Sequence, residues 1–192
     1  SLDKHFRYAT WWATSRWKSS GYKALIFNGA EPINVELCNT FLDKLSLFNL
    51  KSDVLFPVYG LAEATLGVTF PQAGKKLESI TLDRATLHIG TKAEESPSGA
   101  AFVALGTPIP GMEVRVVHEN TLCDELSVGD IHIKGDSVTL GYFNDPVKTN
   151  ETISKDGWLA TGDLGFFKDG QLYITGRSKD LIIINGQNIF PH

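Results

Sequence analysis

The sequence predicts a mixed α/β protein, in which a portion of a parallel sheet is followed by a small β-barrel-like subdomain. Two short apolar runs, residues 22–27 and 53–58, have the length of buried strands and flank an amphipathic stretch. After residue 101, short apolar runs alternate with Gly or Pro turns, which is typical of a small barrel or a distorted sheet. Near the end, Asp169-Gly170 lies between two apolar runs and indicates a β-hairpin, because the primed turns need positive φ angles.

The composition is that of an ordinary globular protein. Of the 192 residues, 42% are apolar and 21% are charged, which supplies a sizeable core and argues against disorder. The net charge is −4 with acids and bases interspersed, so a basic face for nucleic acid is not expected. Cys38 and Cys123 lack metal-ligand spacing and favour free thiols in a reducing cytosol, hence a cytoplasmic protein. No apolar run has the roughly 18 residues of a transmembrane segment.

The first 60 residues predict the order strand, loop, helix, strand, loop. Residues 1–20 are rich in Trp and basic residues and favour a core-facing helix or a linker. The strand ending at Phe27 leads into a Gly-containing loop, and Pro32 is expected to open the helix. Open α/β sheets bind ligands in the loops at the carboxyl ends of their strands, so both loops are candidate binding loops. The apolar residues at helical spacing, expected to face the core, are Val35, Cys38, Phe41, Leu42, Leu45 and Phe48.

Residues 70–100 form a polar segment that Gly and Pro interrupt. We expect a surface loop there with one short strand near residues 79–82. Thirty residues are many for a connection within a compact domain, so the segment favours a functional role. Farther on, Asp145 and Pro146 predict the N-cap and the first position of a short helix that ends near Glu151. The other strands are expected at residues 102–105, 112–117, 131–133 and 138–142.

The predicted hairpin brings an acid and a base together. Asp163 precedes its outgoing strand and Arg177 follows its returning strand. Because a hairpin brings its two ends together, these side chains are expected to be neighbours at one rim. The pair is either a salt bridge at the hairpin base or a binding site. An acid beside an Arg suits a ligand that carries vicinal hydroxyls and an anionic group, as a nucleotide does.

Two motifs in the correct order carry a family resemblance. T-G-D at residues 161–163 is followed by G-R-x-K-D-x-I-I-x-x-G-x-N-x-x-P at residues 176–191. This arrangement resembles the adenylate-forming superfamily of acyl-CoA synthetases, luciferases, nonribosomal peptide adenylation domains and fatty-acyl-AMP ligases. Most members carry a Thr just before the Glu of the Y-G-x-x-E motif, and its hydroxyl contacts the α-phosphate. Here that position is Ala62, and the L-A-E-A-T of residues 61–65 is similar to fatty-acyl-AMP ligases.

The resemblance implies a nucleotide site and assigns roles to its residues. Adenine would lie between the Tyr59 ring and the backbone of Gly29 and Ala30, and Glu63 would hold Mg²⁺. Asp163 would bind the ribose hydroxyls, with Arg177 as its partner at ribose and phosphate, and Asp180 would be the hinge. Glu63 and Arg177 are the implied catalytic residues. The implied nucleotide-binding set is Asn28, Gly29, Ala30, Glu31, Tyr59, Gly60, Leu61, Ala62, Asp163 and Arg177.

The same resemblance divides the chain into four parts. Residues 1–69 would be an α/β portion that carries the adenine and magnesium loops. Residues 70–100 resemble the insertion of fatty-acyl-AMP ligases, which is thought to restrict the domain rotation that CoA chemistry needs. Residues 101–176 would be the β-rich subdomain with the ribose-binding Asp, and residues 177–192 the hinge to a carboxy-terminal domain.

The function that the resemblance implies is adenylation of a fatty acid by ATP with Mg²⁺, which gives acyl-AMP and pyrophosphate. The acyl group would then pass to an acyl carrier protein or to a polyketide or nonribosomal synthase. The alternatives are an acyl-CoA synthetase of the same superfamily and a non-catalytic nucleotide-binding module. Both ends of the chain look cut, and the 192 residues contain neither the Lys-ending triphosphate loop nor the downstream lysine motif. We therefore expect a fragment that is inactive by itself.

Overall fold

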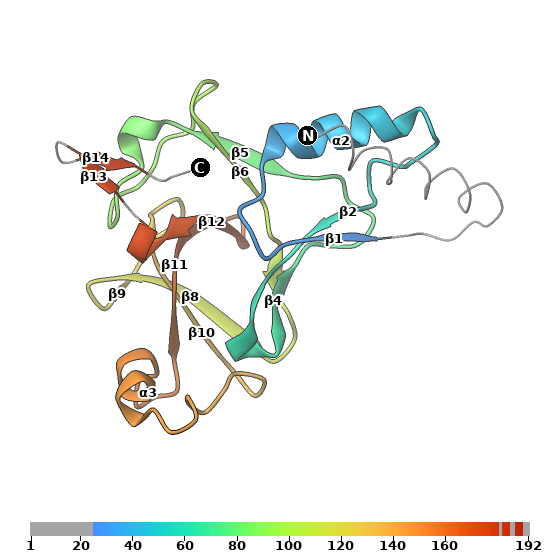
Figure 1. The fold of residues 1–192 in the computed structure, drawn as a ribbon. Helices are drawn as coiled ribbons and strands as arrows, with labels where there is room; N and C mark the ends of the chain where they lie inside the picture. The colour runs from blue at the N-terminus through green and yellow to red at the C-terminus, as the bar shows by residue number, and fades with distance from the viewer. Residues whose placement is uncertain (1–24, 181, 185–186, 190–192) are drawn as a thin grey trace.

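The structure, a computed structural model, describes residues 25–180, 182–184 and 187–189 (Figure 1). The predicted helix or linker of residues 1–20 lies outside the described residues. In the described part, a short parallel pair and its helix lie beside a larger, mainly antiparallel β region (Figure 1). The mixed α/β class that the sequence predicts is therefore confirmed.

The α/β part begins with β1 (Ile26–Asn28), which pairs in parallel with β2 (Leu55–Pro57). The connection carries α2 (Val35–Ser46), whose N-cap is Asn34, because the Asn34 side chain accepts a hydrogen bond from the Leu37 N–H at 2.8 Å. An Asn acceptor satisfies an amide that has no partner within the helix. The prediction that Pro32 opens the helix was therefore wrong, by about one turn.

Only part of the apolar stripe of α2 is buried. Cys38 and Leu45 are buried, and Leu45 packs with Leu50 and Val54 in a small cluster. Phe48, which the sequence placed in the core, is 41% exposed. The helix is thus buried at Cys38 near its start and at Leu45 near its end, while Phe48, two residues beyond the helix, is exposed to solvent.

The next segment forms a three-stranded sheet in the order β3-β4-β7, with β3 (Tyr59–Leu61), β4 (Leu66–Phe70) and β7 (Thr107–Pro108). The 3₁₀ turn η1 (Ala62–Ala64) joins β3 to β4. Val68 of β4 is fully buried in the cluster that contains Ile131 and Ile133. This small sheet therefore covers one face of the large sheet, with Y-G-L of the Y-G-L-A-E segment on its first strand and A-E in the following turn.

Most of residues 70–100 are irregular and exposed, as the sequence predicts, but a few of their apolar side chains are buried. The segment contains β5 (Ser79–Leu82), which confirms the predicted strand, and the 3₁₀ turn η2 (Arg84–Thr86). β5 pairs antiparallel with β6 (Ala100–Val103), two residues earlier than the strand predicted at 102–105. Leu82 and Leu87 are buried in one cluster with Phe166. The segment thus supplies core residues against the strand of the predicted hairpin.

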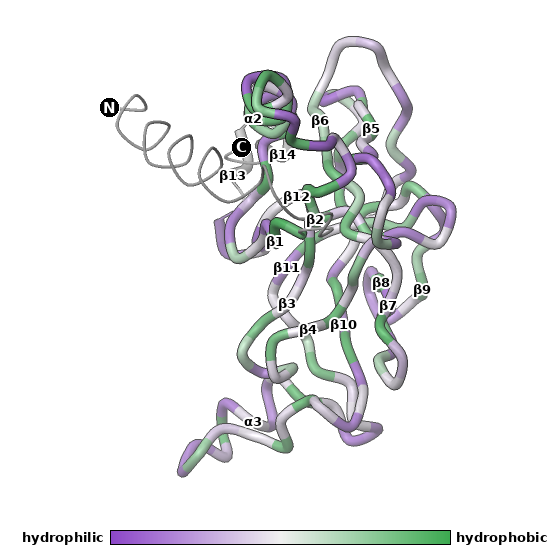
Figure 2. The backbone as a smooth tube through the Cα atoms, turned by 90° about the vertical axis from the view of Figure 1, so that its right-hand side faces the viewer, coloured by the Kyte–Doolittle hydropathy of each residue, from purple (hydrophilic) through white to green (hydrophobic). Residues whose placement is uncertain are grey.

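The large sheet is antiparallel and has the strand order β12-β11-β10-β8-β9. Hydrophobic Ile131 and Ile133 alternate with hydrophilic residues along β10, and hydrophilic residues gather around α3 (Figure 2). The sheet is open, because its end strands β9 and β12 do not pair with each other. The predicted β-barrel-like closure was therefore wrong for the part of the chain that the structure describes. The strands are β8 (Met112–His118), β9 (Thr121–Leu122), β10 (Gly129–Gly135), β11 (Leu159–Lys168) and β12 (Gln171–Arg177).

The connection between β10 and β11 carries α3 (Pro146–Thr152). Its N-cap is Asp145, whose side chain accepts from the Lys148 N–H at 2.9 Å, as the sequence predicts. The strand predicted at residues 138–142 does not form. Gly141 has φ +157, and the Thr139 hydroxyl donates to the Gly141 carbonyl at 2.9 Å, so this backbone turns instead of extending.

After β12 come the 3₁₀ turn η3 (Ser178–Asp180) and an antiparallel pair of β13 (Ile182–Ile184) and β14 (Gln187–Ile189). Within the described residues, no helix has the length and apolar character that a membrane crossing requires.

Candidate nucleotide site

The site is built on the hairpin of β11 and β12. Lys168 pairs with Gln171, and the two residues between them, Asp169 and Gly170, have φ angles of 50° and 73°. This is the left-handed backbone that a two-residue hairpin turn needs. At the other end of the hairpin, Asp163 pairs with Arg177. The Arg177 Nε donates to Asp163 Oδ1 at 3.2 Å, so the predicted neighbourhood of these two residues is confirmed.

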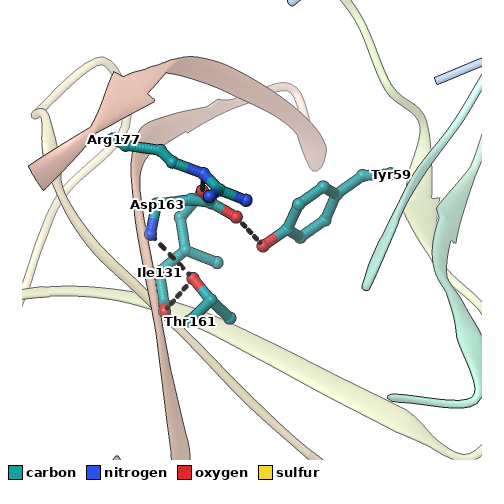
Figure 3. Close-up of polar contacts among 5 residues, drawn as sticks. All are labelled: Tyr59, Ile131, Thr161, Asp163 and Arg177. Carbon is teal, nitrogen blue, oxygen red and sulfur yellow. Dashed lines mark hydrogen bonds and ion pairs between the residues drawn. The ribbon is translucent and has the colours of Figure 1, made fainter. Parts of the chain in front are cut away.

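Thr161 fixes the backbone that presents Asp163. The Asp163 N–H donates to Thr161 Oγ1 at 3.1 Å, and the Thr161 hydroxyl donates to the Ile131 carbonyl at 2.9 Å (Figure 3). The T-G-D segment is thereby tied to the neighbouring strand β10. Sequence reasoning assigned no role to Thr161, although its place as the first residue of T-G-D was an available signal.

Tyr59 is the second side-chain donor to Asp163. Its hydroxyl donates to Asp163 Oδ2 at 2.7 Å, so both carboxylate oxygens accept a side-chain hydrogen bond (Figure 3). Tyr59 is 6% exposed and Asp163 is 8% exposed. Burial, followed by the charge of Asp163, raises the pKa of Tyr59 far above its usual value, so the hydroxyl stays a donor. No local sequence pattern indicates this contact, because 104 positions separate the two residues.

The loop after β1 lies against the segment that leads to Tyr59. The Val58 N–H donates to the Asn28 carbonyl at 2.8 Å. A Cβ added at Gly29 would lie 2.9 Å from the Val58 carbonyl oxygen, so only glycine fits there without a shift. Ala30 has φ 72 and is exposed, as is Glu31. The Asn28 amide points to α2 instead, since its Nδ2 contacts the Cys38 sulfur at 3.5 Å.

Gly60 and Glu63 belong to a tight turn after Tyr59. A Cβ at Gly60 would lie 1.7 Å from the Leu66 carbonyl oxygen, so this position requires glycine. Leu61 packs on the core, and Ala62 is exposed at the start of η1. Glu63 is half-buried, and its Oε1 accepts from the Tyr142 hydroxyl at 2.9 Å. Sequence reasoning missed Tyr142, which is 79 positions away.

Glu63 is the carboxylate that this turn offers to a cation. No group of three or more His, Cys, Asp or Glu side chains that could hold a metal ion occurs among residues 25–180, 182–184 and 187–189. A single carboxylate does not suit an ion that needs several protein ligands. It fits Mg²⁺, which keeps several waters and commonly takes one or two carboxylates together with substrate phosphates.

Two other features take no part in these contacts. Asp180 is in η3 and is exposed. A cavity of about 740 Å³ lies between residues 77–81, residues 95–97 and the tip of the β11–β12 hairpin. None of the predicted nucleotide residues lines it. The geometry therefore joins Gly29, Tyr59, Asp163 and Arg177 through successive contacts, while Glu63 follows Tyr59 on the next turn.

Comparison with known proteins places the chain among related enzymes. Residues 4–143 match the family model described as AMP-binding enzyme. The chain is 40% identical over 178 residues to the medium-chain-fatty-acid–[acyl-carrier-protein] ligase JamA of Moorena producens, covering 85% of this chain and 30% of that protein. It is 37% identical over 187 residues to the 4-hydroxyphenylalkanoate adenylyltransferase of Mycobacterium marinum, covering 89% and 30%.

Solved structures agree with this result. One from studies of fatty acyl-adenylate ligases of E. coli and L. pneumophila has a TM-score of 0.80 and 38% identity, covering 87% of this chain and 31% of that one. The fatty acyl-adenylate ligase from L. pneumophila in complex with acyl adenylate and pyrophosphate has a TM-score of 0.75 and 33% identity, covering 86% and 31%. The chain spans about 30% of the length of the curated relatives it matches.

Proposed function

Since the chain belongs to the AMP-binding enzyme family, we propose that the intact protein joins a fatty acid to ATP, forming acyl-AMP and releasing pyrophosphate. The described residues would supply the part of the site that binds the nucleoside. The observation that carries the proposal is the Asp163 carboxylate, held at the base of a hairpin by Arg177 and Tyr59. A buried acid with two fixed donors is a rigid acceptor for a further polar group.

Asp163 can accept ribose hydroxyls without losing its partners. A carboxylate has about four lone-pair sites, and the two side-chain donors use one on each oxygen. The two ribose hydroxyls would donate to the others, and each such bond to a charged acceptor contributes about 1.5–3 kcal/mol. The Arg177 side chain is 58% exposed, so its guanidinium has terminal N–H groups available for an anionic phosphate near the ribose.

The adenine base would lie between Tyr59 and the loop of Gly29 and Ala30. Because Gly29 has no side chain and Ala30 has a left-handed backbone, the main chain of this loop can approach the face of a flat ring closely. Stacking on an aromatic side chain contributes about 1–3 kcal/mol. Since Tyr59 is 6% exposed, a base that stacks on it would have to displace neighbouring atoms.

Glu63 is the residue proposed to hold Mg²⁺, which would neutralise phosphate charge as the fatty acid carboxylate attacks the α-phosphorus. Adenylation is an in-line displacement that depends on positioning and on electrostatic stabilisation. Ala62 lacks the hydroxyl that most superfamily members place beside the α-phosphate, so the metal and Arg177 carry more of this task here.

For the second step we propose transfer of the acyl group to an acyl carrier protein, alone or within a polyketide or nonribosomal synthase. The carrier-protein ligase activity for which the Moorena relative is named and the L-A-E-A-T segment support this acceptor. The other candidate is CoA, because the chain is also 37% identical over 183 residues to a putative acyl-CoA synthetase of Caulobacter vibrioides. Assaying both acceptors with the intact protein separates the two.

The test of the proposed function uses two acids of the same hairpin. Asp163→Asn should raise the KM for ATP and lower adenylate formation, because the ribose loses its charged acceptor. Asp169→Asn is the matched control: it removes one carboxylate from the same hairpin, and Asn-Gly retains the turn. Pyrophosphate release at limiting ATP is the measurement. Equal rates for both variants would refute the ribose assignment.

Glu63→Gln tests the metal assignment in the same assay. The change retains the shape of the side chain and removes its charge, so kcat should fall and a higher Mg²⁺ concentration should be needed. A magnesium titration that does not move would show that another residue holds the metal.

A further inference from the structure

We propose that Tyr142 is a positioning residue for Glu63: its hydroxyl selects the orientation of the carboxylate that receives the divalent cation. The inference rests on the proposed function of Glu63. Tyr142 belongs to the segment of residues 137–142, which follows β10 and includes the strand predicted at residues 138–142.

Three hydrogen bonds attach this segment to the turn that carries Glu63. The Thr139 N–H donates to the Glu63 carbonyl at 2.7 Å. The Thr65 hydroxyl donates to the Ser137 carbonyl at 2.9 Å. These two bonds hold the main chain, whereas the third, from the Tyr142 hydroxyl to Glu63 Oε1 at 2.9 Å, acts on the carboxylate itself. Of these three bonds, the one from Tyr142 therefore contacts the Glu63 carboxylate directly.

Tyr142 is itself fixed by α3. Its N–H donates to Thr149 Oγ1 at 2.9 Å, and the Thr149 hydroxyl donates to the Asp145 carbonyl at 2.8 Å. Gly141 packs closely beside it, because a Cβ there would lie 2.8 Å from Thr149 Cγ2. The first turns of α3 thus determine where the phenol lies. A donor on a fixed support can orient a Glu side chain, which otherwise rotates about three bonds.

Tyr142 acts on one oxygen of the Glu63 carboxylate. A carboxylate oxygen can only accept, and Glu63 Oε1 accepts from the Tyr142 hydroxyl. One oxygen of Glu63 is thereby directed to Tyr142, and the other is directed elsewhere. Groups that orient a metal-binding residue in this way change metal affinity or activity by about 10- to 100-fold when they are removed.

The test is Tyr142→Phe in the intact protein, with pyrophosphate release measured over a magnesium titration. We expect roughly a 10-fold weaker response to Mg²⁺ or a similar fall in kcat, with the KM for ATP at saturating Mg²⁺ unchanged. Tyr173→Phe is the matched control. Tyr173 is 5% exposed, stacks on Phe166 and is remote from Glu63 in the core cluster of β5 and β11, so it should not shift the titration.

A double-mutant cycle separates positioning from a general structural effect. If Tyr142 acts through Glu63, then Tyr142→Phe should change neither rate nor magnesium response in a Glu63→Gln protein. Effects that simply add, or a control variant that shifts as much as Tyr142→Phe, would overturn the positioning role alone. A Glu63→Gln protein with normal magnesium dependence would instead overturn the assignment of Glu63, and the Tyr142 proposal with it. Thermal unfolding of each variant confirms that the compared proteins are folded.

Discussion

The contact between Tyr59 and Asp163 leads to a prediction about stability. Asp163→Ala removes the acceptor of two side-chain hydrogen bonds. The Arg177 side chain is 58% exposed, so water replaces its lost partner and the ion pair accounts for about 0–1 kcal/mol. The Tyr59 hydroxyl is buried, and leaving such a donor without an acceptor costs about 1–3 kcal/mol. Most of the destabilisation should therefore come from Tyr59.

A cycle with Tyr59→Phe checks this division. In the Asp163→Ala background, Tyr59→Phe removes the hydroxyl that was left unpaired, so it should cost little or should stabilise the protein. The coupling between the two changes is expected to be about 0.5–3 kcal/mol. The measurement is the free energy of unfolding in urea, compared among the unsubstituted protein, both single variants and the double variant.

Arg177→Gln is the control for the charged partner. It leaves the Tyr59–Asp163 bond in place, so its cost should stay within the small range of an exposed ion pair. Strictly additive costs for Asp163→Ala and Tyr59→Phe would refute the reasoning, because two side chains joined by a buried hydrogen bond should show coupling.

Three other predictions concern pH, the insertion and the chain alone. The pKa of Tyr59 is raised from 10.0, so its stabilisation is complete below about pH 10 and is lost as the pH rises through the folded value. Tyr59→Phe should therefore flatten the fall of unfolding free energy above pH 10. If residues 70–100 limit domain rotation, shortening them around the exposed residues 97–99 while keeping Leu82 and Leu87 should preserve adenylation and allow some acyl-CoA, measured as thioester. The 192-residue chain by itself should bind AMP weakly and release no pyrophosphate.

Local chemistry explains which features could be predicted from the sequence. The turn at Asp169-Gly170 and the cap at Asp145-Pro146 depend on residues within a few positions, and both formed as predicted. The meeting of Asp163 and Arg177 follows from the hairpin alone, because 14 positions and one turn determine it. Those predictions needed no knowledge of distant packing.

Long-range packing and competing side chains determine the features that were not predicted from the sequence. The bonds of Tyr59 to Asp163 and of Tyr142 to Glu63 join residues 104 and 79 positions apart, so no local pattern announces them. The start of α2 was misplaced because Pro32 is a weaker signal than the Asn34 side chain that caps the helix. Closure of a barrel requires the end strands to pair, and short apolar runs carry no information on that pairing.

The prediction that the 192-residue chain binds AMP without turnover follows from separating the residues that bind the nucleotide from those that stabilise the transition state. The contacts that would hold adenine and ribose involve Gly29, Tyr59 and Asp163, which all lie within the described residues. Such contacts are the same before and during the reaction, and binding of that kind gives affinity without rate. The stabilising charges of the family, a triphosphate loop and a downstream lysine, have no motif in these 192 residues. Calorimetry with AMP and a pyrophosphate assay with a fatty acid test both halves. Turnover above background would mean that residues outside the predicted nucleotide-binding set take part in the chemistry.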